Sequence, residues 1–117
     1  MKLSEAMRKG IAMSAPLVNR LAELRDEHVY ACALGAAGLG AGLSSFATLS
    51  ESNQDLALCE AFKLDLCPVL DRPMIELLNG DYVPEVGEDL YAIIGTLNDD
   101  GLMTREEIAD WLESIGR

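Results

Sequence analysis

The feature that most constrains the fold is a stretch of residues 29–50 that contains no charged side chain. If helical, it is long enough to cross a bilayer. Its composition argues against a membrane span, because small residues make up most of it and Asp26 and Glu27 stand just before it in place of Lys or Arg. Such small side chains are typical of a helix that packs closely against its neighbours. We therefore expect a buried helix over residues 32–41 and no contact with a membrane.

The length of the chain limits the number of domains. It has 117 residues, of which 50% are apolar, enough for one compact core and too few for two. A chain of this size buries about two thirds of the surface that it exposes when unfolded. We therefore expect one domain over residues 1–117.

The apolar residues outside this stretch mostly follow the period of an α-helix. We predict a mainly α fold, a single-domain bundle of about five to seven short helices. A short extended segment over residues 28–31 is the exception, because its β-branched and aromatic side chains favour a strand. The predicted helices cover residues 3–13, 16–24, 32–41, 50–62, 73–80, 88–97 and 105–115, and residues 81–87 form a loop.

The last two predicted helices have the most regular apolar spacing in the chain. In each, apolar residues stand at i, i+3, i+4 and i+7, which places them on one helix face. Thr104 and Glu107 have the spacing of a capping box. About six residues join the two helices, so we expect a hairpin with Trp111 largely buried in it. The apolar residues are Leu90, Ile93, Ile94 and Leu97, then Ile108, Trp111, Leu112 and Ile115.

The charge of the chain is −11 and is unevenly placed. Residues 1–30 carry five basic and four acidic side chains, whereas the chain from Glu51 onward carries sixteen acidic and four basic ones. Direct binding of DNA or RNA needs a basic surface, so we exclude it for this half. A basic partner protein or a metal cation is the better match, although acidic surfaces also serve solubility alone.

The candidate interaction surface lies on the last predicted helix. Glu106, Asp110 and Glu113 fall on its polar side, opposite the apolar face that contains Trp111. Exposed carboxylates in this arrangement are suited to a basic protein surface. We therefore name these three residues as the site.

No catalytic, cofactor or metal site is predicted. The glycine run of residues 35–42 lacks the Gly-x-Gly-x-x-Gly spacing of a dinucleotide-binding turn. Cys32, Cys59 and Cys67 lack the close pairing of zinc ligands, and the lone His28 has no visible orienting partner for thiol catalysis. We expect buried, reduced thiols in a cytoplasmic protein, with no secretion signal.

The segment of residues 98–107 is similar to part of a calcium loop. With Gly101 at the sixth loop position, Asn98 and Asp100 take positions three and five, and Glu107 takes position twelve. The first position falls on Thr96, so the carboxylate expected there is missing. We favour an inter-helix turn followed by a capping box, and cation binding stays an alternative.

Five short motifs follow one another along the chain: Leu3-Ser-Glu-Ala6, Cys32-Ala-Leu-Gly-Ala-Ala37, Cys67-Pro-Val69, Leu97-Asn-Asp99 and Thr104-Arg-Glu-Glu-Ile-Ala-Asp-Trp-Leu112. In this order they resemble a family of small uncharacterised proteins of phages, prophages and bacteria. The resemblance implies no established activity. Members of that family have a Cys-Pro-x-Cys motif, whereas this chain has Leu70 at the position of the second cysteine. They also have an aromatic residue at the position of Met103. An aromatic residue there implies that this position packs against the last helix.

Three functions follow from these observations, and none is enzymatic. The first is a phage- or prophage-associated protein that binds an unidentified, basic protein partner through its acidic surface. The second is a self-assembling structural or accessory protein, hence a homo-oligomer. The third is a small-molecule or cation-binding domain that uses residues 98–107.

Overall fold

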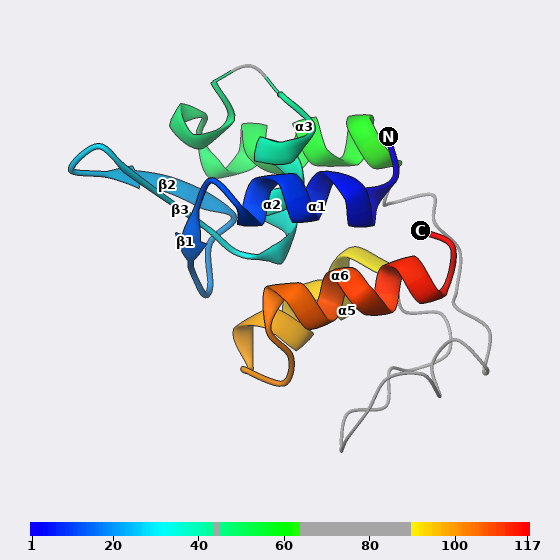
Figure 1. The fold of residues 1–117 in the computed structure, drawn as a ribbon. Coiled ribbons are helices and arrows are strands. Elements are labelled where there is room, and N and C mark those ends of the chain that lie inside the picture. Colours follow the sequence, from blue (N-terminus) through cyan, green and yellow to red (C-terminus); the bar gives the residue numbers. More distant parts are fainter. Residues whose placement is uncertain (44, 64–89) are drawn as a thin grey trace.

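The structure is a computed structural model that describes residues 1–43, 45–63 and 90–117. The chain begins with α1, the three strands of one small sheet follow, and all later described elements are helices (Figure 1). The elements are α1 (Leu3–Ile11), β1 (Ala15–Pro16), β2 (Ala22–Arg25), β3 (His28–Ala31), α2 (Ala33–Gly40), the 3-10 helix η1 (Phe46–Thr48), α3 (Glu51–Phe62), α5 (Leu90–Asp99) and α6 (Arg105–Ser114).

The predicted fold class is wrong. Of the described residues, 58% are helical and 11% lie in strands, so the fold is α+β and not a mainly α bundle. The sheet has the order β1-β3-β2, with β1 parallel and β2 antiparallel to β3. The extended segment predicted over residues 28–31 is confirmed as β3, the central strand of this sheet.

The error lies in residues 16–24, which were predicted to be a helix. They form the end of β1, a connection and the start of β2, and Asn19 in the connection has a φ of 64°, which a helix does not allow. The apolar spacing there fits a helix, but β2 bonds along its length to β3, and this tertiary pairing decides the local structure. The turn between the two strands, Asp26–Glu27, has positive φ at both residues, as a tight type I′ hairpin requires.

The predicted central helix is confirmed as α2, which lies in the core against α1, α3 and α5. Its small residues let the backbone of α1 come close. A Cβ built on Gly10 of α1 would stand 1.7 Å from the carbonyl oxygen of Ala36, and one built on Gly40 would stand 1.7 Å from that of Ala6. The two helices can therefore pack at this distance only with glycine at the crossing.

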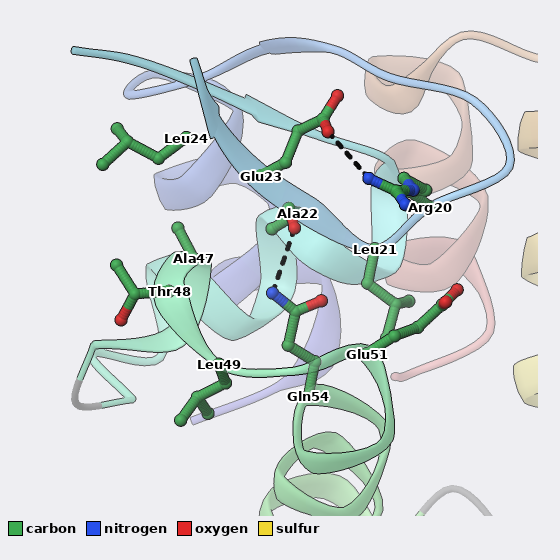
Figure 2. Close-up of a pocket in the computed structure, with 10 residues that line it drawn as sticks. All are labelled: Arg20, Leu21, Ala22, Glu23, Leu24, Ala47, Thr48, Leu49, Glu51 and Gln54. Carbon is green, nitrogen blue, oxygen red and sulfur yellow. Dashed lines mark hydrogen bonds and ion pairs between the residues drawn. The ribbon is translucent and has the colours of Figure 1, made fainter. Parts of the chain in front are cut away.

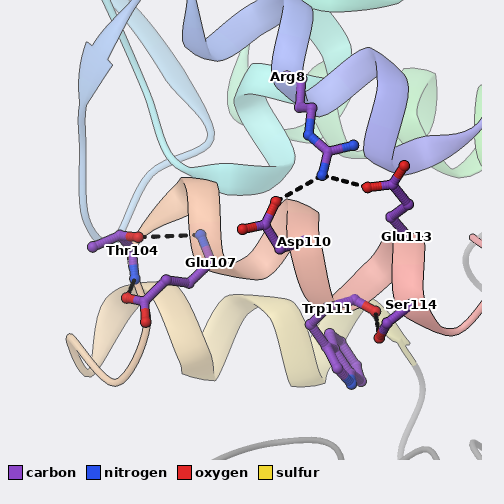
Figure 3. Close-up of polar contacts among 7 residues, drawn as sticks. All are labelled: Arg8, Thr104, Glu107, Asp110, Trp111, Glu113 and Ser114. Atoms are coloured by element: carbon purple, nitrogen blue, oxygen red, sulfur yellow. Dashed lines mark hydrogen bonds and ion pairs between the residues drawn. The ribbon is translucent and has the colours of Figure 1, made fainter.

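The helices predicted over residues 3–13 and 50–62 are confirmed with small shifts of their ends, and the Ser50 hydroxyl caps α3 by accepting a hydrogen bond from the Asn53 N–H. The C-terminal helices are also confirmed, with α6 between α1 and α5 (Figure 3). Trp111 is 4% exposed, as predicted. Four predictions lie outside the described part: the helix over 73–80, the loop over 81–87, the state of Cys67, and residues 88–89 at the start of the helix predicted over 88–97.

No described helix is long and apolar enough to cross a membrane.

Candidate functional site

The three predicted site residues, Glu106, Asp110 and Glu113, all lie on the exposed side of α6. The helix begins at the predicted capping box, in which the Thr104 hydroxyl accepts from the Glu107 N–H at 3.1 Å and the Glu107 carboxylate accepts from the Thr104 N–H at 2.9 Å (Figure 3). The opposite side of α6 is buried in the core. The cap and the core contacts therefore hold the three carboxylates on a fixed surface.

Two of the three carboxylates already bind a cation of the same chain. One guanidinium nitrogen of Arg8, on α1, lies 2.7 Å from an oxygen of Asp110 and 2.7 Å from an oxygen of Glu113 (Figure 3). These hydrogen bonds raise the pKa of Arg8, which keeps it charged. The Asp110 and Glu113 side chains stay 74% and 65% exposed, so solvent weakens the pairs. This group of three side chains keeps one net negative charge.

Glu106 differs from the other two, because it makes no ion pair within the described ranges. It follows Arg105, whose side chain is only 7% exposed. Burial lowers the pKa of Arg105, and the nearby Glu106 carboxylate partly offsets this. The predicted surface therefore consists of one open carboxylate and two that share a guanidinium.

Arg105 is a structural residue that the sequence did not reveal. Its guanidinium donates to the Ser14 hydroxyl at 2.8 Å, to the Ser14 carbonyl oxygen at 3.0 Å and to the Ala31 carbonyl oxygen at 3.2 Å. It thereby joins the start of α6 to β3 and to the segment before β1. A single arginine in a charged motif carries no signal of such long-range bonds.

The segment of residues 98–107 is built as a turn. The Asn98 side chain is buried, its oxygen accepts from the Ala33 N–H at 3.0 Å, and its nitrogen donates to the Leu17 carbonyl oxygen at 3.0 Å. Glu107 is held by the capping box. Two of the three candidate calcium ligands therefore serve the fold, and Gly101, with a φ of 67°, forms the turn. Within the described ranges no group of three or more His, Cys, Asp or Glu residues is arranged to hold a metal ion.

Cys32 is a buried helix cap. Its sulfur accepts a hydrogen bond from the Gly35 N–H at 3.3 Å at the start of α2, and burial raises its thiol pKa to about 11. Cys32 and Tyr91 both line a small hollow of about 130 Å³. Burial and a hydrogen bond with Asp55 raise the pKa of Tyr91. Both groups hold their protons at neutral pH, so neither is a ready nucleophile.

A larger groove of about 440 Å³ runs between β2 and the segment that leads into α3 (Figure 2). One wall consists of the outer edge of β2, and the other consists of η1 and the start of α3. Gln54 spans the groove at one end, where its side-chain nitrogen donates to the Ala22 carbonyl oxygen at 3.0 Å. Leu24, at the other end, is 52% exposed. Sequence patterning missed this groove because it predicted a helix where β2 lies.

Comparisons with models of protein families, with curated proteins and with solved structures found no match to this chain.

Proposed function

We propose that this protein acts in the cytoplasm by binding a basic protein partner through the acidic surface of α6, formed by Glu106, Asp110 and Glu113. The observation that carries the proposal is the position of Arg8, whose guanidinium lies between two of these carboxylates at 2.7 Å from each. Their spacing therefore suits a guanidinium, the group that a basic protein surface offers most readily for carboxylate recognition.

The charge balance supports the same proposal. Two carboxylates share one guanidinium, and Glu106 adds a further carboxylate that forms no ion pair with a cation of the described part. A partner arginine can therefore bind beside Arg8 or replace it without leaving a buried charge unpaired, because all three carboxylates face solvent. Exposed pairs are individually weak, so we expect binding to depend on several contacts and on ionic strength.

The test uses an arginine-rich peptide as the probe, with its dissociation constant measured by calorimetry at low and at physiological salt. Arg8→Ala removes the internal competitor, and we expect it to tighten binding several-fold at low salt. The matched control is Lys9→Ala, which removes the same charge from α1 at a residue that makes no ion pair among the described residues. Equal tightening by both variants would show that only the net charge matters.

The second experiment reverses the charge of the acidic surface of α6. Changing Glu106, Asp110 and Glu113 together to Lys should weaken binding more than tenfold at low salt. Its control is the triple change of Glu51, Glu60 and Asp100 to Lys, which alters the net charge equally at exposed sites on other elements. If the two triple variants bind alike, the acidic surface of α6 has no special part in recognition and the proposal is wrong.

A further inference from the structure

The outer edge of β2 is open at one residue. β2 and β3 are joined by a two-residue turn, so Arg25 and His28, which flank the turn, form a hydrogen-bonded pair. Hydrogen-bonded and non-hydrogen-bonded pairs alternate along antiparallel strands, so the N–H and C=O of the next residue, Leu24, point away from β3. The alternation continues along the strand. The Leu21 carbonyl oxygen accepts from the Cys32 N–H on the β3 side, whereas the Ala22 carbonyl oxygen accepts from Gln54 on the outer side.

The rest of the sheet edge is protected. Gln54 occupies the outer edge at Ala22, and the opposite edge of the sheet is the two-residue strand β1, which ends in Pro16. At Leu24, by contrast, neither the backbone N–H nor the C=O has a partner among the described residues, and the leucine side chain beside them is 52% exposed. Open backbone groups next to an exposed apolar side chain are the features that add a further strand to a sheet.

The sequence around Leu24 is complementary to itself. In an antiparallel pairing of two β2 strands centred on Leu24, the two leucines face each other as the hydrogen-bonded pair. Glu23 of each copy then stands opposite Arg25 of the other. Opposite charges at directly facing positions favour the pairing, and a two-fold axis repeats each contact.

We propose that two copies of this chain associate through β2, antiparallel and centred on Leu24, to form a six-stranded sheet across the dimer. The proposal is independent of the function proposed for α6, because it uses different elements. Each Leu24 N–H donates to the Leu24 carbonyl oxygen of the other copy, and each Leu24 side chain covers part of the groove walled by η1 (Figure 2).

The side chains that flank Leu24 are placed for this pairing. Arg25 is 59% exposed and forms an ion pair with Glu23 of its own chain, while its guanidinium carbon stands 5.3 Å from the centre of the Tyr30 ring. Arg20 holds the other oxygen of Glu23 at 3.1 Å. In the dimer each Arg25 is also within reach of the Glu23 that faces it across the strand pair, so no charge loses its partner.

The dimer is expected to be weak. Only a few residues of each β2 can take part, because Gln54 limits the open edge, and interfaces well below about 1,200 Å² of total buried area are transient. We therefore test it by analytical ultracentrifugation from about 10 μM to about 1 mM protein, the range of weak association. The salt is physiological, which screens the repulsion between two chains of charge −11.

The wild type should shift from monomer to dimer over this range. Leu24→Pro removes the outward N–H without touching the β2–β3 ladder and should weaken dimerisation at least tenfold, and Leu24→Lys should do the same if the proline variant fails to fold. The control is Leu56→Lys, at an exposed leucine on α3, which should dimerise as the wild type does. Circular dichroism checks that each variant is folded.

A charge exchange identifies the facing residues. Glu23→Lys alone and Arg25→Glu alone each place like charges opposite each other in a dimer and should remain monomeric. An equimolar mixture of the two restores opposite charges only between chains, so it should form a mixed dimer. A mixture that stays monomeric while the wild type dimerises would place the interface elsewhere. A wild type that is monomeric at about 1 mM would overturn the proposed dimer. The open edge at Leu24 would then be suited to an extended segment of another protein.

Discussion

The close approach of α1 to α2 at Gly10 predicts that one added methyl group destabilises the protein. We consider Gly10→Ala in α1. The new Cβ would stand 1.7 Å from the Ala36 carbonyl oxygen and 2.4 Å from its carbonyl carbon, whereas real Cβ atoms essentially never come within 3.0 Å of another atom. Both neighbours are backbone atoms of α2, so no side chain can turn away to make room.

The size of the effect follows from two opposing contributions. Alanine is favoured over glycine in a helix interior by about 1 kcal/mol. Against this, α1 must retreat from α2 by more than about 1 Å, which loosens the packing of the whole interface, and overpacking of this kind costs about 3 kcal/mol or more. The net destabilisation is therefore about 2 kcal/mol or more. For a domain of this size that corresponds to a fall in Tm of about 8 °C.

Gly95→Ala is the matched control. Gly95 also lies inside a helix, α5, but a Cβ there would meet nothing within 4 Å. Only the helix propensity then changes, and the variant should gain about 0.5–1 kcal/mol. Urea denaturation of the three proteins measures both effects. If Gly10→Ala is as stable as the wild type, or if both variants shift in the same direction, the close approach of α1 to α2 is wrong.

Three further predictions concern other parts of the fold. Trp111→Ala should cost about 3–5 kcal/mol in urea denaturation, because the indole is buried against the core, and an unchanged midpoint would contradict this. Asn98→Ala should cost about 2 kcal/mol or more, because it strands the Ala33 N–H and the Leu17 carbonyl oxygen, while Asp100→Ala in the same turn should change stability little. The raised pKa of Cys32 predicts that stability falls between pH 9 and pH 11, where the unfolded thiol has lost its proton and the folded one keeps it. Cys32→Ser keeps a capping oxygen and should remove about 2–3 kcal/mol of this pH dependence, and equal pH profiles for the two proteins would refute the assignment.

The sequence predicts those parts of the fold whose signals are local. The capping box at Thr104, the Ser50 cap and the small residues of α2 each follow from residues that lie close together in the chain. The sheet was missed because its stability comes from pairing between segments. The apolar residues of 16–24 fit a helix, and only the partner strand β3 decides against it. Periodicity alone therefore could not distinguish the two structures.

The same limit applies to the candidate site. Glu106, Asp110 and Glu113 could be placed on one helix face from their spacing, but Arg8 pairs with two of them across more than a hundred residues of sequence. Asn98 was considered as a cation ligand because its neighbours match a calcium loop. Its side chain turns instead to the start of α2, a contact that is visible only when the helices are assembled.

The two proposed surfaces respond in opposite ways to salt, which separates them in solution. Each copy carries a charge of −11, so two paired copies repel each other. The screening length falls from about 30 Å at 0.01 M salt to about 8 Å at 0.15 M, so this repulsion is strong at low salt and largely screened at physiological salt. Self-pairing through β2 should therefore strengthen as salt rises from 0.01 M to about 0.15 M, whereas binding of a basic partner to α6 should weaken. Leu24→Pro should weaken only the first of these two associations, because it leaves every charge in place.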